Sequence, residues 1–195
     1  MNFPSQATIL IVPGLRDHVP DHWQTILEAK LKSQQIKVCS VQPLEHDKLS
    51  RAARVQVLDE ALASIDGPVY LVAHSAGAMI TVHWAQTHKR TLEGALLAAP
   101  ADLENPLPPG YPAHADLRAN GWEPIPRTRL PFPSIVAAST NDPLAKYERV
   151  VEFAHAWGSR LVNLGEVGHL KPAAGYGEWA GAEPLIEELV QMATV

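Results

Sequence analysis

Short aliphatic runs recur along the chain, and the longer stretches between them carry apolar residues at every third or fourth position. The short runs mostly do not alternate between apolar and polar residues, which is typical of strands buried on both faces of a parallel sheet. The sequence therefore predicts strands at residues 8–12, 36–41, 68–74, 94–99, 133–139 and 160–164.

The longer stretches have the length and periodicity of amphipathic helices. In the segment 50–65, apolar residues recur at spacings of three and four and fall on one helical face. We expect helices at residues 21–33, 50–65, 76–88, 144–157 and 181–192. The alternation of strands and helices predicts a single α/β domain over residues 1–195, in which a doubly wound, mainly parallel six-stranded sheet lies between two helical layers.

The segment 100–133 departs from this alternation. It holds nine of the 17 prolines and shows no clear periodicity. We interpret it as a long loop rather than a second domain. Compact domains seldom carry such a loop without a use, so it either borders an active site or is a passive surface excursion, and the sequence leaves both interpretations open.

The composition narrows the function classes. The 195 residues are 46% hydrophobic with a mean hydropathy of -0.07, as in a soluble globular domain. The formal net charge of -5 comes from interspersed acids and bases, without a block of Lys and Arg that could bind nucleic acid. The single cysteine, Cys39, excludes an internal disulfide framework and Cys-rich zinc patterns, and we expect it to be a buried thiol.

The first apolar run ends at Pro13 and lacks a charged region before it. It is too short for a signal sequence or a membrane span. Together with the single cysteine, which suits a reducing compartment, this predicts a cytoplasmic protein without membrane contacts.

Residues 73–77, Ala-His-Ser-Ala-Gly, lie where the third predicted strand meets the third predicted helix. This is the context of a nucleophile elbow, which holds a serine on a sharp, strained turn. Small residues are needed two positions before and after the serine, and Ala73 and Gly77 meet that need, although Ala73 departs from the strict glycine pattern. Ser75 is therefore either a nucleophile or a serine in a tightly packed joint.

A serine nucleophile needs a base, and in this fold class the chain order is serine, acid, histidine. His169 follows the last predicted strand, in a loop where Gly165 and Gly168 permit a close approach, and is the preferred base. His114 in the proline-rich segment is an alternative. We interpret three further histidines as structural or solvent-facing: His83, His88 and His155.

Three carboxylates are candidates for the acid that orients the histidine. Asp142 follows the fifth strand, one strand from the His169 loop, and is preferred. Asp102, after the fourth strand, is second and Glu166 is third. Asp142 precedes Pro143 and therefore also has the pattern of a helix N-cap, which does not exclude the orienting role.

Acyl transfer also needs amide donors for an oxyanion. We expect one from Ala76, at the start of a helix, and one from Leu15 or Arg16, in the loop after the first strand, where Gly14 lets amides turn inward. The strand order expected for this fold, 2-1-3-4-5-6, places these two loops side by side. We assign four residues to the substrate pocket: Gly14, Arg16, His74 and Trp179.

The spacing of His18 and His22, with acidic neighbours, suggests a metal site. Pro20 speaks against it, because it would start a helix that leaves His18 off the face of His22. We favour a polar loop lining the pocket and expect no metal. Nucleotide-binding glycine motifs are absent from the sequence, so we expect no cofactor.

With these residues in place, the chain resembles the small serine hydrolase family of retinoblastoma-binding hydrolase and YdeN. The resemblance extends over nearly the whole chain and rests on VPGLRDHVPDHWQ (12–24), LVAHSAGA (71–78), APADLE (99–104), ASTNDP (138–143), AWGSRLVNL (156–164) and GHLKPAAGYGEW (168–179). It implies a capless α/β-hydrolase fold, a triad of Ser75, Asp142 and His169, and activity on small esters.

Two departures limit what the resemblance implies. The family pattern commonly has Asn where this chain has Lys171, which changes the polarity of the pocket. The L-x-C-x-E motif for retinoblastoma protein is absent, because Lys37 and Val41 flank Cys39 at the relevant positions, so that partner is not carried over.

We therefore interpret the chain as a metal-free serine carboxylesterase whose partner is a small-molecule ester. Two alternatives stay open. One is a non-catalytic binding protein on a hydrolase scaffold, and the other is an amidase or acyltransferase with the same triad.

Overall fold

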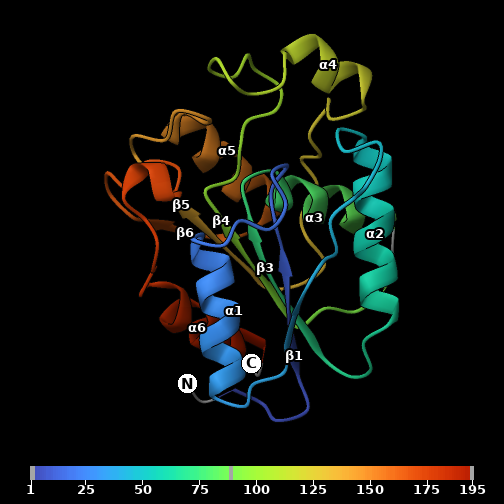
Figure 1. Cartoon of the computed structure of the whole chain (residues 1–195), viewed down its shortest axis with the longest axis vertical. Helices are drawn as coiled ribbons and strands as arrows, with labels where there is room; N and C mark the ends of the chain where they lie inside the picture. Colours follow the sequence, from blue (N-terminus) through green and yellow to red (C-terminus); the bar gives the residue numbers. More distant parts are fainter. Residues whose placement is uncertain (1–2, 88–89, 194–195) are drawn as a thin grey trace.

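The computed structural model describes residues 3–87 and 90–193 and is organised around one six-stranded sheet (Figure 1). All neighbouring strands are parallel, and their order is β2-β1-β3-β4-β5-β6. The strands are β1 (Thr8–Val12), β2 (Val38–Ser40), β3 (Val69–His74), β4 (Gly94–Ala98), β5 (Ser134–Ala138) and β6 (Arg160–Asn163). The predicted fold class and strand order are confirmed.

The helices are α1 (Trp23–Ser33), α2 (Arg51–Ala63), α3 (Ala76–Thr87), α4 (His114–Ala119), α5 (Tyr147–Trp157) and α6 (Ala182–Ala193), with a short 3₁₀ turn η1 (Pro172–Ala174). His88, the last residue of the predicted third helix, lies outside the described residues. Within them, no helix is long and apolar enough to cross a membrane.

Two helices begin later than expected. α1 starts at Trp23 because His22 caps it, its Nδ1 accepting a hydrogen bond from the Gln24 amide at 3.2 Å. Pro20 therefore lies before the helix and not in its first turn, contrary to the prediction. α5 starts at Tyr147 rather than near residue 144, since an extended residue, Lys146, precedes it.

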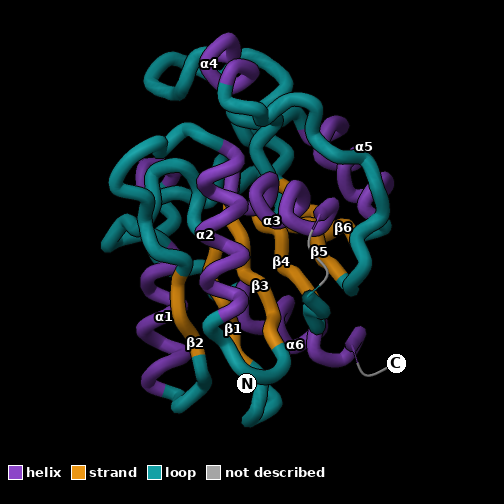
Figure 2. The backbone as a smooth tube through the Cα atoms, turned by 90° about the vertical axis from the view of Figure 1, so that its right-hand side faces the viewer, coloured by secondary structure: helices purple, strands orange, loops and turns teal. Residues whose placement is uncertain are grey.

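The sheet is covered on both faces, as Figure 2 shows. α1 and α6 pack with alternate residues of the central strands, including Ile9 and Val72, in one core cluster. α2, α3 and α5 pack with the intervening residues, including Leu10 and Leu71, in the other. Because successive side chains point to opposite faces, strands buried on both sides need apolar residues throughout, which explains the non-alternating runs.

The proline-rich segment 100–133 is packed rather than structureless. It contains the short helix α4, which the prediction missed, and its Leu117, Trp122 and Ile125 side chains are almost fully buried. The indole of Trp122 donates a hydrogen bond to the Leu49 carbonyl at 2.7 Å, and Trp157 of α5 donates to Pro126 at 2.8 Å. A six-residue helix is too short to show a periodicity among prolines.

Replacing Trp122 with Ala tests how firmly this segment is held. We expect the free energy of unfolding in urea to fall by about 3–5 kcal/mol, because the change leaves a large cavity. Trp122→Phe keeps most of the ring and loses the hydrogen bond, so its expected cost is about 1 kcal/mol. A loss below about 1 kcal/mol for Trp122→Ala would contradict the packing of the segment.

Candidate active site

Ser75 occupies a strained turn between β3 and α3. Its φ is 58°, in the left-handed region that non-glycine residues rarely adopt. Its amide donates to the carbonyl of Ala98 at 3.0 Å, which ties the turn to β4. A Cβ on Gly77 would lie 2.2 Å from the Val12 carbonyl oxygen, so α3 leaves this turn in direct contact with the backbone of β1. The close approach anticipated from the small residues is therefore present.

His169 connects Ser75 with Asp142. Its Nε2 lies 2.8 Å from Ser75 Oγ, and its Nδ1 lies 2.7 Å from Asp142 Oδ2. The side chains of His169 and Asp142 are only 4% and 2% exposed. The other oxygen of Asp142 accepts the Leu144 amide at 2.8 Å, so the carboxylate caps a turn, not α5, and faces His169 at the same time.

Ser139 and Asn141, which the sequence analysis did not single out, join the loops that carry Asp142 and His169. Asn141 Oδ1 accepts the Gly168 amide at 2.7 Å and the Ser139 hydroxyl at 2.9 Å. The Ser139 hydroxyl also accepts the Val167 amide at 3.3 Å. The cluster of short polar residues at the end of β5 was the signal that could have revealed this role.

The other acid candidates lie in different environments. Asp102 accepts hydrogen bonds from Asn105 and Arg149, at 2.7 and 3.2 Å. Glu166 is exposed. Neither belongs to the Ser75–His169 hydrogen-bonded series, in which Asp142 is the carboxylate.

The other histidines also lie apart from this series. His114, on α4, is 3.4 Å from Glu123, and His155 is exposed on α5. His83 is buried in α3 beside the Trp122 ring, and burial, with a contribution from nearby Arg51, lowers its pKa to about 4.

The loop after β1 approaches the serine closely. A Cβ on Gly14 would lie 3.2 Å from the Ser75 Cβ and 3.6 Å from its hydroxyl oxygen, so the loop runs directly beside the Ser75 side chain. Ala76 is the first residue of α3, and amides of a first helical turn have no acceptor within the helix. The predicted amide donors, Leu15 or Arg16 on one side and Ala76 on the other, therefore belong to adjacent segments, the loop after β1 and the start of α3.

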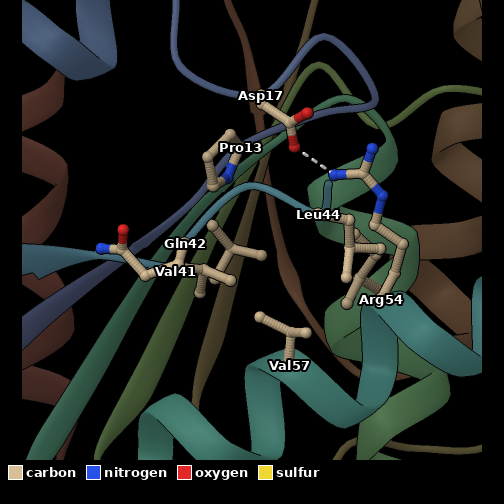
Figure 3. Close-up of a pocket in the computed structure, with 9 residues that line it drawn as sticks. Pro13, Asp17, Val41, Gln42, Leu44, Arg54 and Val57 are labelled. Atoms are coloured by element: carbon tan, nitrogen blue, oxygen red, sulfur yellow. Dashed lines mark hydrogen bonds and ion pairs between the residues drawn. The ribbon is translucent and has the colours of Figure 1, made fainter. Parts of the chain in front are cut away.

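Arg54, from α2, holds the loop after β1 from below (Figure 3). Its guanidinium pairs with the Asp17 carboxylate and donates to the Leu15 carbonyl at 3.2 Å and the Lys48 carbonyl at 2.9 Å. The Arg54 side chain is only 6% exposed. Because a peptide group is planar, holding the Leu15 carbonyl also fixes the direction of the Arg16 amide. The sequence offered no signal for Arg54, which lies on a distant helix.

His74 supports His169 from the β3 side. Burial, and then the proximity of His169 and His22, hold the pKa of His74 well below its usual value, so its ring is neutral. His74 Nε2 lies 2.9 Å from the His169 carbonyl oxygen and donates to it. The His22 ring packs on His74 at 4.6 Å, and burial, together with His169 and His18, lowers the pKa of His22 to about 4.

Gln24 ties α1 to the carboxyl ends of two strands. Its buried side-chain amide donates to the carbonyls of Val72 at 2.9 Å and Val12 at 3.3 Å. This contact sets His22, two residues earlier, against the site.

Ser75 opens into a cavity of about 440 Å³. The predicted pocket residues Gly14, Arg16 and His74 line it, together with His22 and Tyr111. Its walls are mainly apolar, and several come from the segment 101–112, so the proline-rich segment does border the site. Further lining residues include Leu15, Val19, Leu103, Leu107, Leu144 and Pro172.

Trp179 does not line this cavity, contrary to the prediction. Its ring is partly buried and packs perpendicular to Trp23, with centroids 4.8 Å apart, against the core cluster that includes residues of α1 and α6. A glycine-rich neighbourhood fits such a packed ring as well as a pocket rim: a Cβ on Gly181 would lie 2.8 Å from the Trp179 indole nitrogen.

The described residues contain no group of three or more His, Cys, Asp or Glu side chains that could hold a metal ion. His18 is exposed, and His22 caps α1. At Ser75 itself, the hydroxyl lies next to the His169 imidazole, which in turn contacts the Asp142 carboxylate.

Comparisons with known proteins identify the family and the fold. The family model described as serine hydrolase matches residues 9–188. Among solved structures, a YdeN-like hydrolase from Pectobacterium atrosepticum is 28% identical, with a TM-score of 0.81 over 96% of this chain and 92% of its own. The ydeN gene product of B. subtilis is 15% identical, with a TM-score of 0.75 over 95% and 99%. No curated protein sequence matches the chain.

Replacing Gly77 with Ala tests the contact between α3 and β1. The added methyl group would meet backbone atoms, which cannot move aside as a side chain can, and we expect a loss of about 3 kcal/mol in the free energy of unfolding. Gly177→Ala is the matched control, because a Cβ there meets nothing closer than 3.7 Å and its φ is not positive. Equal melting temperatures for the two variants would contradict the close contact.

Arg54 and Asp17 form a buried pair whose coupling is measurable by a double-mutant cycle. Arg54→Met leaves the Asp17 carboxylate unpaired, and we expect a loss of about 3 kcal/mol in chemical denaturation. Asp17→Asn preserves the backbone, since Asn tolerates the φ of 55° found at residue 17. The double variant should be more stable, by at least about 1 kcal/mol, than the sum of the two losses implies. Additive losses would show that the two side chains act independently.

Proposed function

The chain belongs to the serine hydrolase family, and we propose that it is a carboxylesterase that hydrolyses esters of small acyl groups through Ser75, His169 and Asp142. The observation that carries this proposal is the hydrogen-bonded series from Ser75 Oγ to His169 at 2.8 Å and on to Asp142 at 2.7 Å. A serine hydroxyl is a poor nucleophile unless a base takes its proton, and this series supplies the base and its orienting acid.

In the first half of the reaction, Ser75 Oγ forms a bond to the ester carbonyl carbon while its proton passes to His169 Nε2. The carbonyl oxygen takes the negative charge and is stabilised by the amide of Ala76 and that of Leu15, with Arg16 as the alternative donor. Asp142 accepts the hydrogen bond from His169 Nδ1 and stabilises the imidazolium. The bond to the alcohol then breaks, and the alcohol leaves with the proton from His169.

In the second half, water attacks the acyl group on Ser75 and passes a proton to His169. The new oxyanion accepts hydrogen bonds from the same amides. The bond from the acyl carbon to Ser75 Oγ then breaks, the proton returns to the serine, and the carboxylic acid departs. Water is thus the second reactant, and the proton moves between Ser75, His169 and the reacting groups throughout.

Small acyl groups suit the cavity beside Ser75. A volume of about 440 Å³ lies within the range for small-molecule sites, and its walls are mainly apolar. The segment 101–112 supplies part of these walls. We therefore expect short esters to be better substrates than long-chain ones.

Labelling with a fluorophosphonate probe tests the proposal. We expect the wild-type protein to be labelled at Ser75, as mapped by mass spectrometry, and to hydrolyse p-nitrophenyl acetate. Ser75→Ala should abolish labelling and lower kcat by at least about 10⁴-fold, because triad members act as a unit. Asp142→Asn should lower kcat by about 10⁴-fold through the wrong histidine tautomer.

Ser64→Ala is the matched control, since Ser64 is exposed at the end of α2, and it should leave both readouts unchanged. If the folded wild-type protein is neither labelled nor active on short esters, the esterase proposal is refuted and a binding function on this scaffold is favoured. If amides are hydrolysed in preference to esters, the activity is that of an amidase instead of an esterase.

A further inference from the structure

Two positively charged side chains meet over one aromatic ring at the cavity beside Ser75. The guanidinium of Arg16 lies 5.1 Å from the centroid of the Tyr111 ring, and the Lys171 ammonium lies 5.3 Å from the same centroid. The Lys171 ammonium also donates a hydrogen bond to the Tyr111 hydroxyl at 2.8 Å. All three residues line the cavity.

Neither charge is balanced by a carboxylate within residues 3–87 and 90–193. Asp17 is the one carboxylate among the described lining residues, and its charge is engaged by buried Arg54. The acids of the neighbouring segment, Asp102 and Glu104, pair with Arg149. The net charge of the chain is -5, so two cations on one ring without a carboxylate partner in the described part of the chain form a local concentration of positive charge.

The two cations reach the cavity from different loops, each next to a segment of the proposed machinery. Arg16 directly follows Leu15 in the loop proposed to hold the oxyanion, and Lys171 lies two residues after His169. Tyr111 reaches the cavity from the proline-rich segment. Arg16 is exposed and Lys171 half-buried, so both charges stay reachable by a molecule that enters the cavity.

The contacts with Tyr111 hold these cations without neutralising them. An aromatic face attracts a cation through its quadrupole, and a neutral hydroxyl accepts a hydrogen bond while carrying no charge. The Tyr111 hydroxyl keeps its own hydrogen for a further acceptor. Arg16 offers a planar fork of donors, Lys171 a compact charge and Tyr111 a hydroxyl, a set that matches the oxygens of one carboxylate.

We propose that the substrates are acidic esters, in which a carboxylate is held by Arg16, Lys171 and Tyr111 while Ser75 attacks the ester carbonyl. The inference rests on the proposed esterase function and names its substrate class. The apolar walls receive the carbon chain between the ester and the carboxylate. Attraction between the carboxylate and two cations at the cavity favours binding of the acidic ester over its neutral counterpart.

Two matched pairs of esters test the proposal on the purified protein. Mono-p-nitrophenyl glutarate is compared with p-nitrophenyl valerate, which places the carboxylate on the acyl side. 4-Valeryloxybenzoate is compared with 4-valeryloxybenzamide, which places it on the alcohol side. We expect kcat/KM to be about fivefold to tenfold higher for the acidic member of at least one pair, and this ratio to fall as salt is added.

Variants connect the preference to the two cations. Lys171→Gln and Arg16→Gln should each lower the acidic-to-neutral ratio by about threefold or more, and Lys171→Arg, which keeps the charge, should restore most of it. Because the ratio is taken within one variant, a general loss of activity cancels. Lys37→Gln is the matched control, since Lys37 is exposed at the opposite end of the sheet, and its ratio should equal that of the wild type.

Equal kcat/KM within both pairs would overturn the proposal, and so would a preference that both glutamine variants retain. If neither member of any pair is turned over, the esterase function fails, and calorimetry on Ser75→Ala protein decides the inference separately. There, tighter binding of 4-valeryloxybenzoate than of its benzamide, lost in Lys171→Gln, would support the acidic site. Equal binding of the two compounds would overturn it.

Discussion

The contact of α3 with the end of β1 is the constraint on which the rest of the site depends. Since Gly77 has no side chain, the helix can leave β3 directly against the Val12 carbonyl, and the chain must turn sharply at Ser75 to do so. That turn forces the serine into the left-handed region and presents its hydroxyl above the sheet. The first amide of α3 and the loop after β1 then meet beside it as a result of the same crossing.

Hydrogen bonds between loops determine where the other two groups lie. The loops after β5 and β6 are joined through Ser139 and Asn141, which lets His169 reach the serine although β6 lies three strands from β3. From the opposite side, the neutral ring of His74 holds the His169 carbonyl. The imidazole is thus restrained through its ring and through its backbone. This double restraint keeps the His169 ring aligned with the buried Asp142 side chain.

The sequence predicted what depends on local pattern and topology. Apolar runs gave each strand to within a few residues, and the positions of Ser75, Asp142 and His169 after their strands followed from the order of the sheet. Contacts between distant elements were not predicted. The sequence around Arg54, which lies under the loop after β1, and around Trp179, which packs against Trp23, does not differ from that of an ordinary helix or loop. The short helix α4 was not predicted because six residues among prolines are too few to show a helical periodicity of apolar positions.

The proline-rich segment is divided between support and recognition. Its second half is anchored in the core through Trp122 and through the bond from Trp157 to Pro126, whereas residues 101–112 reach the cavity. Residues 101–103 belong to the core, whereas 105–112 are exposed or half-buried. Substitutions in residues 105–112 can therefore change the shape and charge of the cavity while the anchor and the sheet stay as they are. Such an arrangement separates the evolution of selectivity from the maintenance of the fold, so that related chains can acquire different substrates by altering a single short stretch.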